Sequence, residues 1–291
     1  MGRAFAESVP AARAVFEDAD RAVGYGLTEL CFEGPIERLS ETEVTQPALV
    51  AATLACLAAV RESDLTPDFV IGHSVGEYAA LVASGALGAP DAVRLVRERG
   101  IATAAAAAER PGAMAAVIGL DDEVVERLCD EIDGVWAANY NSPGQVVVSG
   151  TVAGVLALMA SAEAAGARRA IRLKVSGGFH SPLTAPAEPR LEAAVARVDF
   201  DEPSIPFFST VSCGLEHAEA IPRLLVEQLT APVRFTQGVE RLRDLGVGTF
   251  IEIGPGSVLS GLVRRIDRSL SAMSISDPDG LDRVLLERAN G

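Results

Sequence analysis

The sequence predicts an α/β fold in which a larger α/β domain is interrupted by a smaller ferredoxin-like domain of order βαββαβ. Two observations lead to this prediction. An apolar run at 68–71 ends in a Gly-x-Ser-x-Gly turn, and an apolar helix pattern over 75–84 follows it, which together form a strand–turn–helix unit. Between 111 and 176, strand-like and helix-like patterns alternate in the order β-α-β-β-α-β, which is the ferredoxin-like split motif.

Each element of the small domain is predicted from its local pattern. We expect strands at 113–119, 135–140, 145–149 and 169–175, and helices at 121–131 and 151–165. Asp121 is suited to cap the first of these helices, and Asn-Ser-Pro-Gly at 141–144 predicts a turn between the two middle strands. The small domain is therefore placed at 111–176 and the larger domain at 1–110 and 177–291.

The larger domain is predicted from helical periodicity and two short strands. Helices are expected at 1–23, 46–62, 75–84 and from 91 past 99, and strands at 68–71 and 249–253. The run at 68–71 is short and apolar and stops at a glycine, which predicts a buried strand. The second strand ends in a Gly-Pro-Gly turn at 254–256, and we expect a helix after it.

The composition fits a chain with a sizeable core and little affinity for nucleic acid. Of the 291 residues, 49% are hydrophobic, and the formal net charge is −15. Such an acidic chain repels phosphate backbones, so we expect no general nucleic-acid binding. Residues 1–20 contain acids early and no long apolar core, so we expect no signal peptide. No run of about 18 uncharged apolar residues occurs, so we expect no membrane span.

The cysteines give no indication of a disulfide framework or a metal site. The four are far apart and form no Cys-x-x-Cys pair: Cys31, Cys56, Cys129 and Cys213. This spacing favours a reducing compartment, which predicts a cytoplasmic protein. We therefore expect no metal ion and no bound cofactor.

Ser74 is the candidate nucleophile because it is the central residue of Gly72-His73-Ser74-Val75-Gly76, a match to Gly-x-Ser-x-Gly. In α/β-hydrolase-like folds this turn exposes the serine between a buried strand and a helix. The N–H groups at the start of that helix would suit a developing oxyanion. The alternative is a glycine-rich turn whose serine only caps the helix.

A serine nucleophile needs a base, and His180 is the preferred candidate of three histidines. It occupies a Gly- and Pro-containing loop directly after the small domain, where a cleft between domains is expected. His73 adjoins the nucleophile and is expected to point elsewhere, and His217 lies in an acidic stretch typical of a surface. The alternative for His180 is a loop histidine bonded to local backbone. No acidic residue is singled out by spacing as an orienting partner.

Arg99 is the candidate positive group. At about 100° per residue it falls on the apolar face of its helix, with Leu95 and Val96, whereas Arg94 and Arg97 point the other way. A buried arginine needs a carboxylate or phosphate partner. Two interpretations are open at this point: a salt bridge inside the core, or a clamp for a substrate carboxylate.

Several stretches together resemble the malonyl-CoA:acyl carrier protein transacylase family and the related acyltransferase domains of polyketide synthases. They occur in the family's order and cover nearly the whole chain. The stretches are Thr45-Gln46-Pro47-Ala48, Gly72-His73-Ser74-Val75-Gly76-Glu77-Tyr78, Arg97-Glu98-Arg99-Gly100, Gly112-Ala113-Met114-Ala115-Ala116-Val117, Asn139-Tyr140-Asn141-Ser142-Pro143-Gly144-Gln145, Phe179-His180-Ser181 and Glu252-Ile253-Gly254-Pro255-Gly256.

The resemblance implies a reaction and a role for each main residue. Ser74 would carry a malonyl ester and His180 would act as general base and acid, in a ping-pong transfer from malonyl-CoA to the phosphopantetheine thiol of an acyl carrier protein. Arg99 would hold the malonyl carboxylate, and the N–H of Val75 would contact the oxyanion. The family uses a Ser–His dyad without an acid, and a backbone carbonyl, here matching Gln228, would orient the imidazole.

The resemblance also implies a pocket and a cellular role. Gln46 and Asn141 look like pocket-lining positions, and Phe179 before the histidine resembles the malonyl-type pattern, where methylmalonyl-type relatives usually carry serine. Coenzyme A enters as a substrate thioester, so no cofactor is implied. The pathway would be fatty acid or polyketide biosynthesis in the cytoplasm.

The sequence departs from the family's pattern at its start. Family members usually begin with a strand and a Gly-Gln-Gly-Ser-Gln loop that supplies the second oxyanion donor, and no match to either precedes Met1. Two explanations are open: Met1 is internal to a longer chain, or the protein lacks this half of the oxyanion hole. The alternatives to an active transferase are a serine thioesterase or hydrolase, which would share the serine turn, and, because this loop is absent, a catalytically impaired acyltransferase-like protein.

Overall fold

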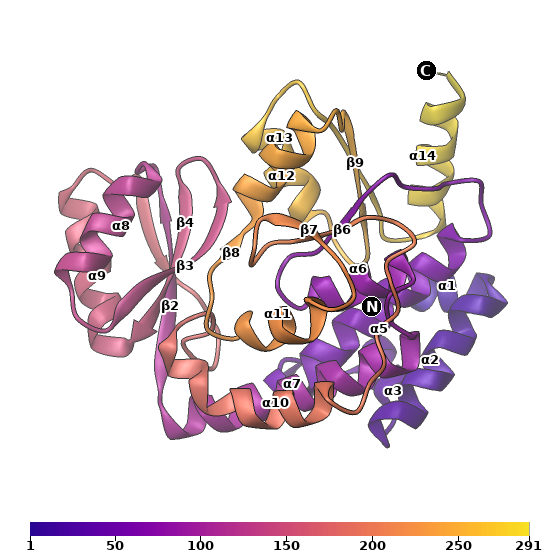
Figure 1. Cartoon of the computed structure of the whole chain (residues 1–291), viewed down its shortest axis with the longest axis horizontal. Helices are drawn as coiled ribbons and strands as arrows, with labels where there is room; N and C mark the ends of the chain where they lie inside the picture. The colour runs from indigo at the N-terminus through magenta and orange to yellow at the C-terminus, as the bar shows by residue number, and fades with distance from the viewer. Residues whose placement is uncertain (291) are drawn as a thin grey trace.

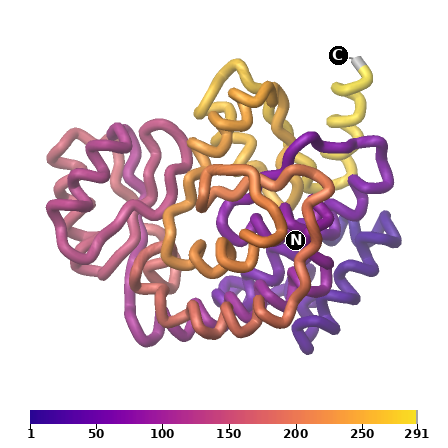
Figure 2. The backbone as a smooth tube through the Cα atoms, viewed as in Figure 1, coloured from indigo at the N-terminus to yellow at the C-terminus, as the bar shows by residue number. Residues whose placement is uncertain are grey.

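The chain folds into a large body and a smaller lobe beside it. The structure is a computed structural model, and it describes residues 1–290; position 291 of the predicted larger domain lies outside the described residues. Figure 1 shows the lobe, residues 112–172, on the left and the N-terminal helices on the right. The tube in Figure 2 follows the chain out into the lobe and back into the body, so the body is built from segments on both sides of the lobe.

The N-terminal part of the body is helical. It contains α1 (Arg3–Ser8), α2 (Pro10–Val23), α3 (Leu27–Glu33), α4 (Ile36–Leu39) and α5 (Thr42–Val60). The single helix predicted over 1–23 is wrong, because the chain is extended at Val9 and a new helix starts with Pro10, which has no N–H to donate. The predicted helix at 46–62 begins one turn earlier and continues through Pro47.

Helix α5 forms the centre of the main core. By length and composition it alone among helices within residues 1–290 could cross a membrane, but 72% of its most apolar window is buried by other parts of the protein. Its contacts with α2 and α7 (Ala89–Glu109) explain its composition, because a helix that is apolar on all sides is suited to a protein interior. The apolar composition of α5 is therefore accounted for by packing.

The nucleophile segment lies on a small mixed sheet of order β1-β6-β7. In this sheet β1 (Val70–Ile71) is parallel to β6 (Phe207–Ser209), and β7 (Gly214–Glu216) is antiparallel to β6. The strand at 68–71 was predicted to be buried, and this is wrong: β1 is half-buried because it is an edge strand paired on one side. Helix α6 (Gly76–Ser84) follows it, and α10 (Glu188–Val195) and α11 (Ile221–Glu227) complete this part of the body.

The C-terminal part of the body adds a second small sheet. Strands β9 (Thr249–Ile253) and β10 (Ser271–Ile275) form a parallel pair, with α13 (Val258–Ile266) between them in the chain. Apolar side chains of α12 (Phe235–Asp244) and α13 pack on this pair. The last helix, α14 (Pro278–Asn290), lies against β10 at the upper right of Figure 1.

The lobe has the predicted element order. It consists of β2 (Gly112–Ile118), α8 (Asp122–Glu131), β3 (Val135–Ser142), β4 (Gln145–Thr151), α9 (Val152–Ala164) and β5 (Arg169–Arg172). The strand order β5-β2-β4-β3, with antiparallel neighbours throughout, agrees with the predicted ferredoxin-like motif. A fifth strand from the body, β8 (Val233–Arg234), pairs in parallel with β3 and was not predicted.

The two faces of the lobe's sheet have different partners. Because successive side chains of a strand point to opposite faces, Ala113, Ala115 and Val117 pack on the helices α8 and α9. The alternate residues Met114 and Ala116 form a separate cluster with Phe179 on the other face. The sheet therefore contributes one face to the lobe's own core and the other to the loop that leaves the lobe.

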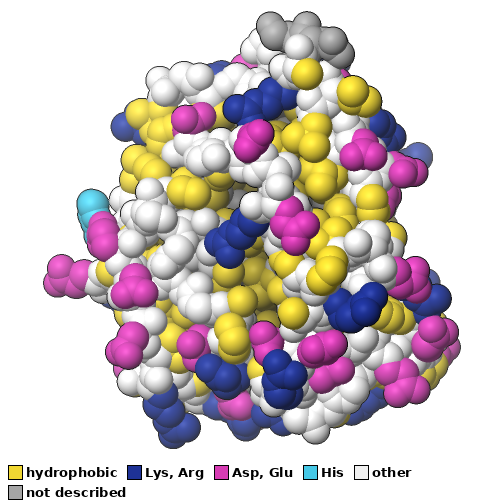
Figure 3. Space-filling model, turned by 90° about the vertical axis from the view of Figure 1, so that its right-hand side faces the viewer, with side chains coloured by type: hydrophobic (Ala, Val, Ile, Leu, Met, Phe, Trp, Pro, Cys, Tyr) yellow, Lys and Arg dark blue, Asp and Glu magenta, His cyan; other side chains and the backbone are white. Residues whose placement is uncertain are grey.

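Charges of both signs are mixed on the surface. Figure 3 shows acidic and basic side chains interspersed, with hydrophobic ones between them, on the face at the right of Figure 1. Several exposed arginines pair with nearby carboxylates, for example Arg21 with Asp18 and Arg94 with Asp91. Such exposed pairs contribute little to stability, about 0–1 kcal/mol each.

Candidate active site

Ser74 lies at a sharp turn between β1 and α6. Its backbone has φ 51°, in the left-handed region, which is costly for a residue other than glycine. Gly72 makes the turn possible, because a Cβ at this position would lie 2.3 Å from the backbone nitrogen of Glu77. The alternative that Ser74 only caps the helix is wrong: Val75 is the N-cap, no side chain caps α6, and the Ser74 hydroxyl contacts an imidazole.

His180 contacts Ser74 and two distant carbonyl groups. Its Nε2 lies 2.7 Å from Ser74 Oγ, and its Nδ1 lies 2.9 Å from the Gln228 oxygen and 3.2 Å from the Ala231 oxygen. Carbonyl oxygens only accept hydrogen bonds, so Nδ1 carries the proton and Nε2 is free to accept from the serine hydroxyl. The alternative of a histidine bonded to local backbone is therefore wrong.

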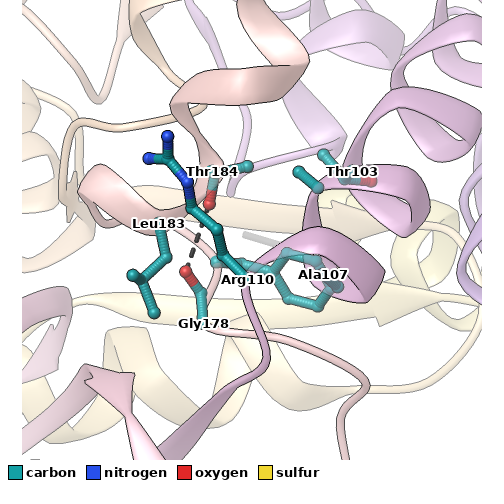
Figure 4. Close-up of a pocket in the computed structure, with 8 residues that line it drawn as sticks. Thr103, Ala107, Arg110, Gly178, Leu183 and Thr184 are labelled. Atoms are coloured by element: carbon teal, nitrogen blue, oxygen red, sulfur yellow. Dashed lines mark hydrogen bonds between the residues drawn. The ribbon is translucent and has the colours of Figure 1, made fainter.

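The loop that presents His180 is fixed by short-range hydrogen bonds. Ser181 Oγ donates to the Gly178 oxygen at 2.6 Å. Thr184 Oγ1 donates to the same oxygen at 3.1 Å, the bond drawn as a dashed line in Figure 4. The 3-10 helix η1 (Pro182–Ala187) begins directly after Ser181. A narrow pocket borders this loop and α7, and the residues labelled there are Thr103, Ala107, Arg110, Gly178, Leu183 and Thr184 (Figure 4). The loop is thus held at the junction of the lobe and the body.

Burial keeps the imidazole neutral. Desolvation, with smaller contributions from Arg99 and His73, lowers the pKa of His180 from 6.5 to about 3, although hydrogen bonds to the carbonyls of Gln228 and Ala231 oppose this. A neutral imidazole with its proton on Nδ1 is the form that can accept a proton from Ser74.

This pKa predicts how the rate depends on pH. We expect the rate of acyl-enzyme formation to show no acid limb at 6.5, because His180 stays neutral until the pH falls to about 3. The measurement is a pH profile of ester formation on Ser74 at subsaturating thioester. A fall in rate centred at 6.5 would contradict it. Between about 3 and 6.5 the unfolded imidazole binds more protons, so His180 also makes folding stability fall as the pH falls through this window.

Arg99 is buried beside Ser74. Only 5% of the residue is exposed, and it lies on the apolar face of α7 as predicted. Its guanidinium donates to Gln46 Oε1 at 2.6 Å, to Ser74 Oγ at 3.2 Å and to Gln228 Oε1 at 3.2 Å. None of these acceptors is a carboxylate, and Arg99 is in no ion pair among residues 1–290, so the interpretation as a core salt bridge is wrong. The clamp for a substrate carboxylate stays a prediction.

Two glutamine side chains fix the guanidinium. Gln46 Nε2 donates to Thr103 Oγ1 at 3.1 Å, so Gln46 Oε1 faces Arg99. Gln228 Nε2 donates to the Ser74 carbonyl at 3.1 Å and to a carboxylate oxygen of Glu77, so its Oε1 also faces Arg99. The resemblance implied only the backbone carbonyl of Gln228, and the structure gives its side chain contacts of its own.

Glu77 belongs to the family-like stretch around Ser74, but no role was predicted for it from the sequence. It is 1% exposed, and it accepts hydrogen bonds from the Thr210 N–H at 2.6 Å, the Thr210 hydroxyl at 2.8 Å and the Ser209 hydroxyl at 3.3 Å. Burial raises the pKa of Glu77 above its usual value, although these hydrogen bonds act in the opposite direction. A carboxylate in the first turn of an otherwise apolar helix was the pattern that could have identified it.

The other predicted residues are placed around this network. Val75 follows the nucleophile, and no acceptor for its N–H is found within residues 1–290, which leaves that donor free. Asn141 contacts His73 and not the network itself: its Oδ1 lies 2.9 Å from His73 Nε2. Phe179 packs against the lobe's sheet.

The remaining histidines are outside the dyad. His73 points to Asn141, as expected from its position beside the nucleophile, and burial lowers its pKa. His217 is exposed and pairs with Glu202. Within residues 1–290, no group of three or more His, Cys, Asp or Glu could hold a metal ion. The site thus consists of an activated hydroxyl, a neutral imidazole and a buried guanidinium.

The chain is similar to known acyl transferases over nearly its whole length. A family model described as an acyl transferase domain matches residues 1–277. The malonyl CoA-acyl carrier protein transacylase of Bacillus subtilis (strain 168) is 45% identical over 290 residues, which cover 98% of this chain and 92% of the relative. The enzyme of the same name from Escherichia coli (strain K12) is 40% identical over 285 residues, which cover 96% and 92%.

Solved structures superpose on nearly the whole chain. The acyl-carrier-protein S-malonyltransferase of Bartonella henselae superposes with a TM-score of 0.94 at 39% identity, covering 99% of this chain and 94% of that one. The malonyl-transacylase of a type II polyketide synthase, solved in complex with its acyl-carrier protein, gives 0.95 at 40% identity with the same coverage. The chain therefore belongs to the malonyl CoA-acyl carrier protein transacylase family of acyl transferase domains.

Proposed function

We propose that this chain transfers a malonyl group from coenzyme A to the phosphopantetheine thiol of an acyl carrier protein, through an ester on Ser74. One observation carries the assignment of roles: Ser74 Oγ lies 2.7 Å from His180 Nε2 and 3.2 Å from a guanidinium nitrogen of Arg99. The first contact activates a nucleophile, and the second places a fixed positive charge where the acyl group must lie.

In the first half-reaction, Ser74 Oγ attacks the thioester carbonyl and His180 Nε2 takes the hydroxyl proton. The developing oxyanion is stabilised by the free N–H of Val75 at the start of α6. Collapse of the tetrahedral intermediate breaks the C–S bond. His180 returns its proton to the departing coenzyme A thiolate, and malonyl stays on Ser74.

In the second half-reaction, the carrier's thiol attacks the ester carbonyl and His180 takes the thiol proton. The C–O bond to Ser74 breaks, and the same proton passes to the serine oxygen, so the enzyme is regenerated. The Gln228 and Ala231 carbonyls hold the Nδ1 proton throughout and keep the imidazole in the orientation that both steps need.

Arg99 selects the acyl group. We propose that the malonyl carboxylate replaces weaker contacts of the guanidinium and forms a charge-assisted pair with it. Gln46 and Gln228 hold the guanidinium, Asn141 orients His73 beside the nucleophile, and Phe179 limits the space next to His180. An acyl chain without a carboxylate would leave the buried charge unpaired, which opposes its binding.

The predicted division of the chain into two domains fits this function. We propose that residues 1–110 and 177–291 form the catalytic domain and that residues 111–176 form a small domain that closes the site at the loop carrying His180. All four cysteines are free, and none lies in a site that could hold a metal within residues 1–290. The free thiols support our proposal of a cytoplasmic enzyme, because a reducing compartment keeps cysteines unpaired.

A two-stage labelling experiment tests the function. The chain is incubated with malonyl-CoA labelled in the malonyl group, the protein is isolated, and acyl carrier protein with its phosphopantetheine arm is then added. We expect label on Ser74 first and on the carrier thiol second. Release of labelled malonate to water alone would support a hydrolase, and no label on Ser74 would overturn the proposal.

A further inference from the structure

A single amide separates the buried guanidinium of Arg99 from the buried carboxyl group of Glu77. The Gln228 side chain accepts from Arg99 Nη2 at 3.2 Å through its Oε1 and donates to a carboxylate oxygen of Glu77 through its Nε2. All three residues are at most 5% exposed. Among the described residues, no carboxylate contacts Arg99 directly. Glu77 is linked to Arg99 through one intervening side chain, that of Gln228.

The orientation of the Gln228 amide is fixed by its partners. Arginine has only donors, so the atom facing Arg99 must be the amide oxygen, and the nitrogen must face Glu77 and the Ser74 carbonyl. One Glu77 oxygen therefore accepts from Gln228, and the other accepts from the Thr210 N–H. Each oxygen receives a donated hydrogen bond, which is the pattern of an ionised carboxylate.

We propose that Glu77 is a positioning residue that acts through Gln228: it fixes the amide that holds Arg99 and leaves the guanidinium charge unneutralised for the substrate carboxylate. This inference rests on the proposed function and adds how its selectivity is maintained. A carboxylate in direct contact with Arg99 would compete with malonyl for the same donors, whereas a carboxylate one amide away orients the guanidinium without occupying them.

A free donor of Arg99 supports this arrangement. The guanidinium has five N–H groups, and the contacts to Gln46, Ser74 and Gln228 use three. Arg99 Nε is buried and has no hydrogen-bond partner among residues 1–290. A buried donor without a partner is costly, and a substrate carboxylate that reaches it removes that cost.

The test is the variant Glu77→Gln, assayed for kcat and KM with malonyl-CoA and with acetyl-CoA. The introduced amide must turn its oxygen to the Thr210 N–H, so its NH2 group faces the NH2 group of Gln228. Gln228 can then accept from the introduced amide only by turning its single oxygen away from Arg99. We expect the preference for malonyl over acetyl, as a ratio of kcat/KM, to fall about tenfold or more.

The matched control is Thr210→Val, which removes one hydroxyl bond to Glu77 but leaves the carboxylate and the Thr210 N–H in place. We expect this variant to unfold at a lower temperature and to keep the malonyl preference. A purely structural role of Glu77 predicts instead that both variants lower stability and that neither changes the preference, which would overturn the inference.

A second variant keeps the inference testable if Glu77→Gln does not fold. The double change Glu77→Gln with Gln228→Glu moves the carboxylate into direct contact with Arg99, and its two side chains can still bond each other. We expect a raised KM for malonyl-CoA and a lowered malonyl preference; an unchanged preference would overturn the inference. If the unmodified protein forms no ester on Ser74, the proposed function itself is overturned. This outcome is distinguishable from an unchanged malonyl preference in the variants, which overturns only the role of Glu77.

Discussion

Replacing Ser74 with alanine is expected to lower the rate of malonyl transfer by about 10⁴-fold or more and to abolish the covalent ester. The change removes the only hydroxyl within hydrogen-bond distance of His180 Nε2 among residues 1–290. Without it, malonyl-CoA still meets the Arg99 guanidinium, so binding is expected to survive while chemistry stops. The measurement is label retained on the protein after gel filtration, together with the steady-state transfer rate.

The control for this prediction is Ser84→Ala. Ser84 is a fully buried serine at the other end of the same helix, and its hydroxyl donates to the Leu81 carbonyl at 2.8 Å. We expect a modest loss of stability and full ester formation, because this hydroxyl lies outside the site. Labelling of the Ser74→Ala variant at wild-type level would show that another residue is the nucleophile.

Replacing Arg99 with alanine is expected to shift the preference away from malonyl and toward uncharged acyl groups. Loss of the charge-assisted pair to the malonyl carboxylate should lower kcat/KM for malonyl-CoA about 100-fold. Acetyl-CoA makes no such pair, so the ratio of its kcat/KM to that of malonyl-CoA should rise. The change also leaves Gln46 and Gln228 without a donor, so some loss in kcat is expected for both substrates. The measurement is kcat/KM for the two thioesters in parallel.

The control for Arg99 is Arg97→Ala on the same helix. Arg97 is half-buried and contacts Glu98 at 3.5 Å, outside the network of Ser74 and His180. We expect its removal to leave the malonyl preference intact. If Arg99→Ala keeps the wild-type ratio of malonyl to acetyl transfer, the guanidinium does not select the acyl group.

The lobe illustrates how well local patterns predict structure. Its strands and helices begin and end within two residues of the predicted positions, except for β5, which ends at Arg172 and not at 175. The alternating pattern of the strands and the Asn-Ser-Pro-Gly turn depend on residues that are neighbours in the sequence. The sequence alone is therefore sufficient to predict these elements. Strand β8 was not predicted because its two residues are too few to show an alternating pattern. They form a strand only because they pair with β3.

The helices of the body show where local patterns are insufficient. Pro10 was within a region predicted as one helix, yet it begins a new one, whereas Pro47 lies inside α5. The difference is set by packing, because α5 is held on several sides by other helices and tolerates a missing hydrogen bond. Likewise, the half-buried state of β1 depends on which strands pair with it, and its own residues do not determine that.

The sequence by itself determined the lobe's element order, the serine turn, the apolar face that buries Arg99, and the family, because each depends on short patterns or on several motifs in a fixed order. Only the tertiary structure decided what surrounds Arg99. Its bond to Gln228 spans 129 positions, and the bond from Gln228 to Glu77 spans 151. No periodicity links residues so far apart; folding brings them together, and burial then makes their hydrogen bonds obligatory.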